Sequence, residues 1–308
     1  MFDGESAPVF PHHLPELMEK HGHDLGLLSS TPFSNDLMLD MGLAAIEGES
    51  LGSRDTPDLL AISFSATDAV GHQFGPGSIE VQDTYLRLDM TIGRLLDYLD
   101  KNLGKNNVLV FLTSDHGVSY VPDYLVELGI PGGRFDGKAN LDSLRGFLMD
   151  QYGADLLLSF SNYEVFLDHE QMDQKDLDHE KVQNEVARFM LSLKGVAGAL
   201  TASALNNTQF TQGIRAKVQQ GFNQKRSGDV MVWLEPHTTT GSSSRGTTHG
   251  SPWAYDTHAP MHWYGKNVPP GRSSHPTFIS DIASTVAIFL NSPFPSGNTG
   301  RPMNEFMK

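Results

Sequence analysis

The chain of 308 residues contains no cysteine and few basic residues. The lack of cysteine excludes disulfide frameworks, thiolate nucleophiles and cysteine-ligated zinc sites. Any metal ion must then be held by His and Asp, and 13 histidines are present. Lys and Arg total 22 against 37 Asp and Glu, which gives a formal net charge of −15. We therefore expect no nucleic acid polymer among the ligands, because no basic stripe is present to neutralise its phosphates.

Long hydrophobic runs are missing as well. The longest apolar stretches, 108–112 and 282–290, fall far short of the roughly 20 residues that a membrane helix needs. Residues 1–6 carry neither the basic nor the apolar segment of a signal peptide. The sequence therefore predicts a globular chain with no membrane span and no signal peptide of its own.

Two apolar runs flank the most regular amphipathic pattern of the sequence. Residues 59–64 and 108–112 are predicted to be buried strands. Apolar residues at steps of three or four predict a helix between them, over 81–99. An earlier helix is expected to begin at Asn35 as its N-cap residue and to end near Gly48. Strand, helix and strand in this order predict an open α/β sheet flanked by helices.

Residues 155–236 interrupt this pattern. They predict, in order, a strand at 156–167, a helix at 180–193, a strand at 195–201, a helix at 212–220 and a strand at 229–234. This β-α-β-α-β order predicts a small inserted α+β cap. The metal-binding α/β core would then comprise residues 1–154 and 237–308. Its last strand is expected near 259–264 and its final helix near 281–290.

Residues that can bind a metal ion follow each predicted strand. Asp68 and His72 come after the first strand, and Asp115 and His116 come directly after the second. In open α/β sheets, function collects at the carboxyl ends of the strands, so we expect these side chains to lie close together. His249, beside a glycine, precedes the last predicted strand and adds a third imidazole. Carboxylate oxygen and imidazole nitrogen are ligands that suit zinc.

Three segments resemble the PafA type of bacterial alkaline phosphatases, in the type I phosphodiesterase and nucleotide pyrophosphatase branch of the alkaline phosphatase superfamily. These segments are 65–72 (SATDAVGH), 112–117 (LTSDHG) and 248–251 (THGS). The resemblance extends from about residue 33 to the C-terminus and includes the intervals between the candidate ligands. It implies an alkaline-phosphatase-like α/β fold.

The resemblance also implies two zinc ions and a hydrolytic activity. Asp68, His72 and His249 would bind one ion, and Asp115 and His116 would be two ligands of the other. The implied reaction is the hydrolysis of small phosphate monoesters, in the periplasm or outside the cell. A phosphodiesterase or nucleotide pyrophosphatase of the same superfamily is the alternative.

The nucleophile of the family has no counterpart in this sequence. In the family, a Thr or Ser at a helix start follows a strand and a metal-binding Asp near the N-terminus. Residues 1–30 contain no such pattern. We therefore interpret the chain as the C-terminal portion of a larger enzyme, with the missing N-terminal half as its partner. A catalytically inactive metal-binding fragment is the remaining alternative.

Two residues after His249 leave alternatives open. His258 precedes the proline that enters the last predicted strand, so its position also suits a metal ligand. The glycine beside His249 and its interval from His116 favour His249, because both match the family. Asp256 is interpreted either as a hydrogen-bond acceptor for a ligand imidazole or as a solvent-exposed loop carboxylate.

Overall fold

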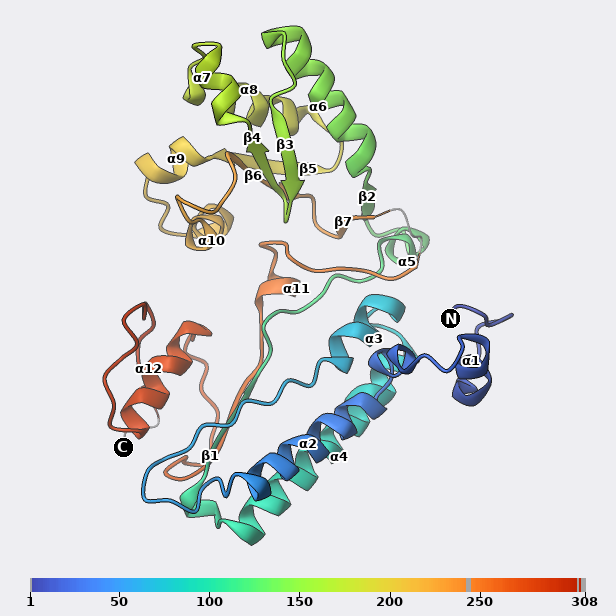
Figure 1. Ribbon diagram of the computed structural model, residues 1–308, viewed down its shortest axis with the longest axis vertical. Coiled ribbons are helices and arrows are strands. Elements are labelled where there is room, and N and C mark those ends of the chain that lie inside the picture. The colour runs from blue at the N-terminus through green and yellow to red at the C-terminus, as the bar shows by residue number, and fades with distance from the viewer. Residues whose placement is uncertain (1, 242–244, 304, 306–308) are drawn as a thin grey trace. The chain divides into compact units, whose positions relative to one another are not determined.

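The structure, a computed structural model, describes residues 2–241, 245–303 and 305 (Figure 1). The chain divides into two units. The first unit comprises Met1–Val70, Ser78–Asp115 and Ala259–Lys308, and the second comprises Gly71–Gly77 and His116–His258. Among the described residues, no helix has both the length and the apolar character that crossing a bilayer requires.

The first unit is mainly helical. Its elements are α1 (Leu14–Lys20), η1 (Leu25–Ser30), α2 (Phe33–Gly48), α4 (Ile79–Asn102), η2 (Lys105–Asn107), β1 (Leu109–Thr113), β8 (Met261–Gly265) and α12 (Ser280–Phe289). Helix α3 (Ala66–Phe74) begins in this unit and ends in the second. Helix α2 begins before Asn35, which lies buried inside it, so the prediction of Asn35 as the N-cap residue is wrong.

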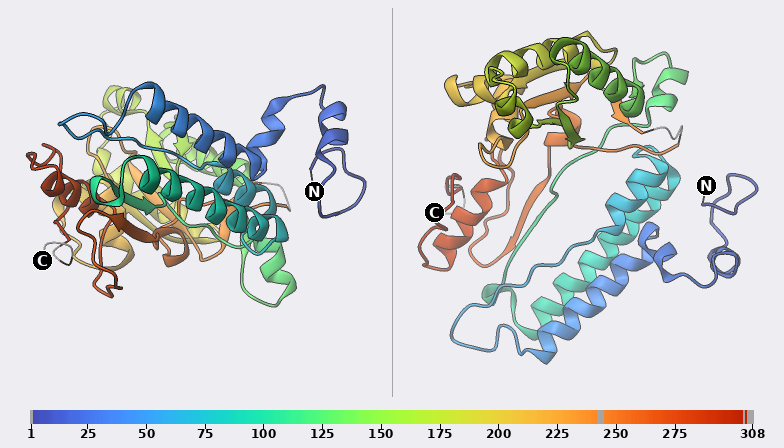
Figure 2. Two further views of the ribbon diagram at one scale, coloured as in Figure 1. Left: turned by 90° about the horizontal axis from the view of Figure 1, so that it is seen from below. Right: turned by 45° about the horizontal axis from the view of Figure 1, so that its top comes forward.

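Helices α2 and α4 lie side by side (Figures 1 and 2). Three side-chain hydrogen bonds join them, from Thr91 to Asp36 (2.9 Å), from Arg94 to Asp40 (2.9 Å) and from Tyr98 to Glu47 (3.1 Å). The residue numbers of the bonded partners rise together along both helices. The two helices are therefore parallel, and polar side chains set their register.

Strands β1 and β8 form a two-stranded antiparallel sheet, with Leu109 opposite Gly265 and Thr113 opposite Met261. Segment 59–64, predicted to be a buried strand, belongs to no helix or strand. Leu59 is 72% exposed and Leu60 is 39% exposed. The prediction of a paired and buried strand here is wrong for the described chain, because no strand of that chain pairs with the segment.

The second unit contains the larger sheet. Its elements are α5 (Pro122–Glu127), β2 (Gly133–Phe135), α6 (Gly137–Tyr152), β3 (Leu157–Ser161), β4 (Glu164–Leu167), α7 (His169–Gln174), α8 (His179–Ser192), β5 (Val196–Thr201), α9 (Ala202–Asn207), α10 (Gly213–Gly221), β6 (Val230–Leu234), β7 (Thr238–Thr240) and α11 (Ala254–Thr257). The order of the four-stranded sheet is β3-β4-β6-β5, with all neighbours antiparallel. Strands β2 and β7 form a separate parallel pair.

A hairpin replaces the single strand predicted over 156–167. Strands β3 and β4 are joined by Asn162 and Tyr163, whose φ angles are +50° and +62°. Two successive residues in the left-handed region are typical of a type I′ turn, which matches the twist of the flanking strands. The apolar pattern continues through the turn, so it does not reveal the reversal of the chain.

Helices α6 and α8 pack on the four-stranded sheet (Figure 1). Leu144 and Leu148 of α6 are fully buried, as are Val182, Val186 and Met190 of α8. Steps of four residues place each set on one face of its helix. These side chains join those of β3 to β6 in the main hydrophobic core of the described chain.

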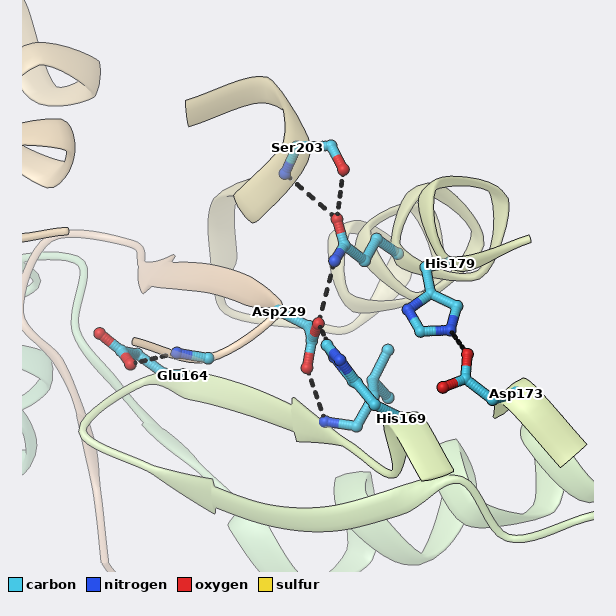
Figure 3. A network of polar contacts seen from close by, with 9 residues as sticks. Glu164, His169, Asp173, His179, Ser203 and Asp229 are labelled. Carbon is cyan, nitrogen blue, oxygen red and sulfur yellow. Dashed lines mark hydrogen bonds and ion pairs between the residues drawn. The ribbon is translucent and has the colours of Figure 1, made fainter. Parts of the chain in front are cut away.

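Asp229 is a buried carboxylate that joins several elements of this core (Figure 3). It accepts hydrogen bonds from the Leu167 N–H (2.8 Å), from His169 Nε2 (2.7 Å) and from Gln183 Nε2 (2.9 Å). Gln183 accepts in turn from the backbone N–H and the hydroxyl of Ser203. Both oxygens of the buried carboxylate are therefore satisfied, and its bonds link β4, α7 and α8.

We predict that Asp229→Ala lowers the free energy of unfolding by about 3 kcal/mol, because three donors lose a charged acceptor. Asp173→Ala is the matched control. The Asp173 side chain is 74% exposed and pairs with His179 at 2.8 Å, so its loss should cost less than about 1 kcal/mol. Urea unfolding followed by tryptophan fluorescence measures both, and equal losses would contradict the prediction.

Candidate metal centre

Three of the five predicted ligands, His72, His116 and His249, lie together in the second unit. The rings of His116 and His249 are stacked, with centroids 3.4 Å apart and 15° between their planes. The His72 ring centroid is 4.9 Å from that of His249. These residues come from α3, from the segment after β1 and from the loop before α11. We call them the histidine cluster.

His72 is fixed by two hydrogen bonds to Thr247. Its Nδ1 lies 2.8 Å from the Thr247 carbonyl oxygen, and its own carbonyl accepts the Thr247 N–H at 2.9 Å. Because a carbonyl oxygen only accepts, Nδ1 carries the hydrogen and the ring lone pair lies on Nε2. Gly246, with φ +78°, precedes this contact, and a Cβ there would lie 2.4 Å from the His72 oxygen. Glycine at 246 therefore permits the close approach.

His116 has the same tautomer for the same reason. Its Nδ1 lies 2.9 Å from the carbonyl oxygen of Gly117. The Gly117 N–H donates to the Asp256 carbonyl oxygen at 2.7 Å. A Cβ on Gly117 would lie only 2.1 Å from the carbonyl oxygen of Tyr255. Glycine at 117 therefore lets the segment that carries His116 lie directly against α11.

Asp68 and Asp115, the two predicted carboxylate ligands, belong to the first unit. Asp68 lies on α3, in a helix rather than directly after a paired strand as the sequence predicted. Positions i and i+4 share one face of a helix, so α3 presents Asp68 and His72 on the same side. Asp115 directly precedes His116, and both carboxylates are exposed.

Asp256 and His258 differ sharply in burial. Asp256 is 4% exposed, so its interpretation as a solvent-exposed carboxylate is wrong. Its Oδ2 accepts the Ser251 N–H at 2.7 Å, while its Oδ1 has no hydrogen-bond partner among the described residues. His258 is exposed at the C-terminal end of α11. In the described chain, the ring contacts of the cluster involve His249 and not His258.

His237 lies beside α11, and sequence analysis does not single it out. Its ring is stacked on Tyr255 with centroids 4.5 Å apart, and its backbone N–H donates to the Tyr255 hydroxyl at 3.0 Å. Its Nδ1 is 3.0 Å from Ser119 Oγ. Burial lowers the pKa of His237, and the negative charge of Asp256 offsets this only in part. An isolated histidine has no spacing pattern that would mark such a position.

The match to a known family decides the classification of the chain. The family described as type I phosphodiesterase / nucleotide pyrophosphatase matches residues 30–259. The chain belongs to this family. Members with solved structures provide a direct comparison of its fold.

This member of the type I phosphodiesterase family is 40% identical to a Myroides odoratus protein named calcium-transporting ATPase. It is 34% identical to the alkaline phosphatase PafA of Elizabethkingia meningoseptica. Both alignments cover 99% of this chain and 56% of the relative. The crystal structure of wild-type PafA matches with a TM-score of 0.92 over 99% of this chain and 58% of that one. The predicted alkaline-phosphatase-like α/β fold is confirmed, and the chain spans just over half the length of these relatives.

We predict that His237→Asn weakens the acid sensitivity of the fold. The folded-state pKa of His237 lies below its ordinary value of 6.5. The folded state therefore holds fewer protons, and this group's contribution to stability is present above the unfolded pKa and is lost as the pH falls through the window below it. The variant lacks this loss, and asparagine tolerates the left-handed φ of +56° at this position.

Urea unfolding at about pH 7.5 and about pH 5 measures the effect. The wild type should lose more unfolding free energy between these values than His237→Asn does. His258→Asn, at an exposed position, is the control and should follow the wild type. Identical pH dependence in the wild type and His237→Asn would contradict the prediction.

Proposed function

We propose that the protein is part of a zinc-dependent phosphatase that hydrolyses small phosphate monoesters. The main support is the convergence of His72, His116 and His249 in one cluster. It occurs in a chain that is 34% identical to an alkaline phosphatase over 99% of its length. A periplasmic or extracellular location is part of this proposal.

In this proposal, Asp68, His72 and His249 hold one zinc ion, and Asp115 and His116 are two ligands of a second. Imidazole nitrogen and carboxylate oxygen form a donor set that suits zinc. The hydrogen bonds from Nδ1 to carbonyl oxygens support the assignment, since they orient the rings of His72 and His116 and leave their lone pairs on Nε2. When bound, zinc ions would polarise the phosphate oxygens and stabilise charge on the attacking and leaving oxygens.

The nucleophile, a Thr or Ser, is proposed to come from polypeptide outside this chain. The relatives extend well beyond the part that this chain matches, since the alignments cover 56% of their length. Segment 59–64 lacks a paired strand in the described chain, and β1 pairs with β8 alone. An N-terminal half with further strands fits both observations, because a two-stranded sheet is marginally stable by itself. Without that half, the chain would be an inactive metal-binding fragment.

Residues 155–236 are proposed to form a cap that restricts bulky substrates, and residues 1–154 and 237–308 the metal-binding core. The strands of the four-stranded sheet pair only with one another in the described chain. They also enclose a hydrophobic core of their own. Both properties support an inserted element that folds around its own sheet.

A phosphodiesterase is the second candidate function. The printed description of the matching family, type I phosphodiesterase / nucleotide pyrophosphatase, favours it. The metal ligands would be the same for both activities, so the two candidates differ in the leaving group and in the substituent on the phosphate.

The metal site yields a prediction that separates His249 from its rival. We predict that the chain binds zinc and that His249→Ala lowers the affinity at least tenfold, because a direct ligand is lost. His258→Ala, its matched control, should leave the affinity unchanged. Three ligands at one site against two at the other should also give one tighter and one weaker ion. Competition with a chromophoric chelator measures both affinities, and no zinc binding, or equal effects of the two variants, would contradict the assignment.

The activity prediction compares this chain with a longer protein. Alone, it should hydrolyse p-nitrophenyl phosphate barely or not at all, because covalent phosphoryl transfer needs a hydroxyl activated at the metals. Fusion of the unmatched N-terminal part of PafA in front of this chain should raise the rate at least about 100-fold. His116→Ala in the fusion should remove that gain.

The substrate separates the two candidate functions. The fusion should prefer p-nitrophenyl phosphate to bis-p-nitrophenyl phosphate, and the reverse preference would favour the phosphodiesterase. Robust turnover by this chain alone would contradict the proposal that its nucleophile lies elsewhere.

A further inference from the structure

Asp256 bonds to both segments that carry the stacked histidines. Its carbonyl oxygen accepts the N–H of Gly117, the residue after His116, at 2.7 Å. Its side-chain Oδ2 accepts the N–H of Ser251, two residues after His249, also at 2.7 Å. A single residue thus ties together two segments that are far apart in the sequence.

The side chain of Asp256 is more costly than this bridging role requires. One acceptor suffices for the Ser251 N–H, and a neutral side chain would supply it. The carboxylate is instead 4% exposed with Oδ1 lacking a hydrogen-bond partner in the described part of the chain. Burial of an unpaired carboxylate oxygen lowers stability. Such a cost is typical of functional positions rather than of positions that serve the fold alone.

We propose that Asp256 is a positioning residue of the metal centre. By holding the Ser251 N–H, it fixes the loop that carries His249 against the segment that carries His116. This inference rests on the proposed function, because it assumes that the histidine cluster binds zinc. It adds a residue that lies outside the proposed set of ligands.

The test compares Asp256→Ala with Asp256→Asn. Asparagine keeps an acceptor oxygen for the Ser251 N–H, whereas alanine removes it. Asp281→Ala is the matched control, because Asp281 is also buried and accepts the N–H groups of Phe278 and Arg301, both at 2.8 Å. It belongs to the first unit and carries no role in the proposed centre.

Zinc affinity, measured by competition with a chelator, is the main readout. Asp256→Ala should lower it at least about tenfold, while Asp256→Asn and Asp281→Ala should stay within about threefold of the wild type. Cobalt(II) absorption provides a second readout. The spectrum should change in Asp256→Ala and stay that of the wild type in Asp256→Asn, because only alanine frees the loop. If Asp256→Ala does not fold, the shorter Asp256→Ser takes its place.

Three results would overturn the inference. They are an unchanged affinity in Asp256→Ala, an equally low affinity in Asp256→Asn, and an equal loss in Asp281→Ala, which would indicate general destabilisation. Absence of zinc binding by the wild type is a separate outcome, since it contradicts the proposed function and the inference with it. The variants alone therefore decide the role of Asp256.

Discussion

The arrangement of the histidine cluster depends on one close backbone contact, between Gly117 and the Tyr255–Asp256 peptide of α11. A Cβ at position 117 would lie 2.1 Å from the Tyr255 oxygen, so only glycine permits the contact. The hydrogen bond from Gly117 N to Asp256 O then sets its geometry. Because His116 and His249 flank this contact, their stacking follows from the backbone rather than from attraction between the rings. The imidazoles are held in place before any ligand arrives, which reduces the ordering cost of binding.

The two units differ in how they obtain stability. The second unit encloses a core in which Leu144, Val186 and Met190 are fully buried. The first unit has a two-stranded sheet and leaves large apolar side chains such as Leu59 and Met41 exposed. Exposed apolar surface of this kind marks regions that other polypeptide covers. The histidines thus belong to the self-sufficient unit, whereas both proposed carboxylate ligands belong to the unit whose sheet is incomplete.

The sequence predicted the elements that depend on local pattern. The periodic helix at 81–99 corresponds to α4, and the run 108–112 corresponds to β1. Apolar composition predicts that a segment such as 59–64 prefers burial, but it does not identify a partner strand. Ligand residue types were also accessible, because Asp, His and Gly occur together in short segments. The ring tautomers and the burial of Asp256 were not, because each depends on contacts between segments that are distant in the sequence.

Two buried carboxylates of the second unit illustrate how a structural role differs from a functional one. Asp229 uses both oxygens, which accept from Leu167, His169 and Gln183, so its charge is balanced by donors of the fold itself. Asp256 is as deeply buried, yet the described residues satisfy only one of its side-chain oxygens. A carboxylate that served only the fold would gain stability from a second donor or from replacement by a neutral acceptor. The unpartnered oxygen, rather than burial, therefore distinguishes the carboxylate that serves the centre from the one that serves the core.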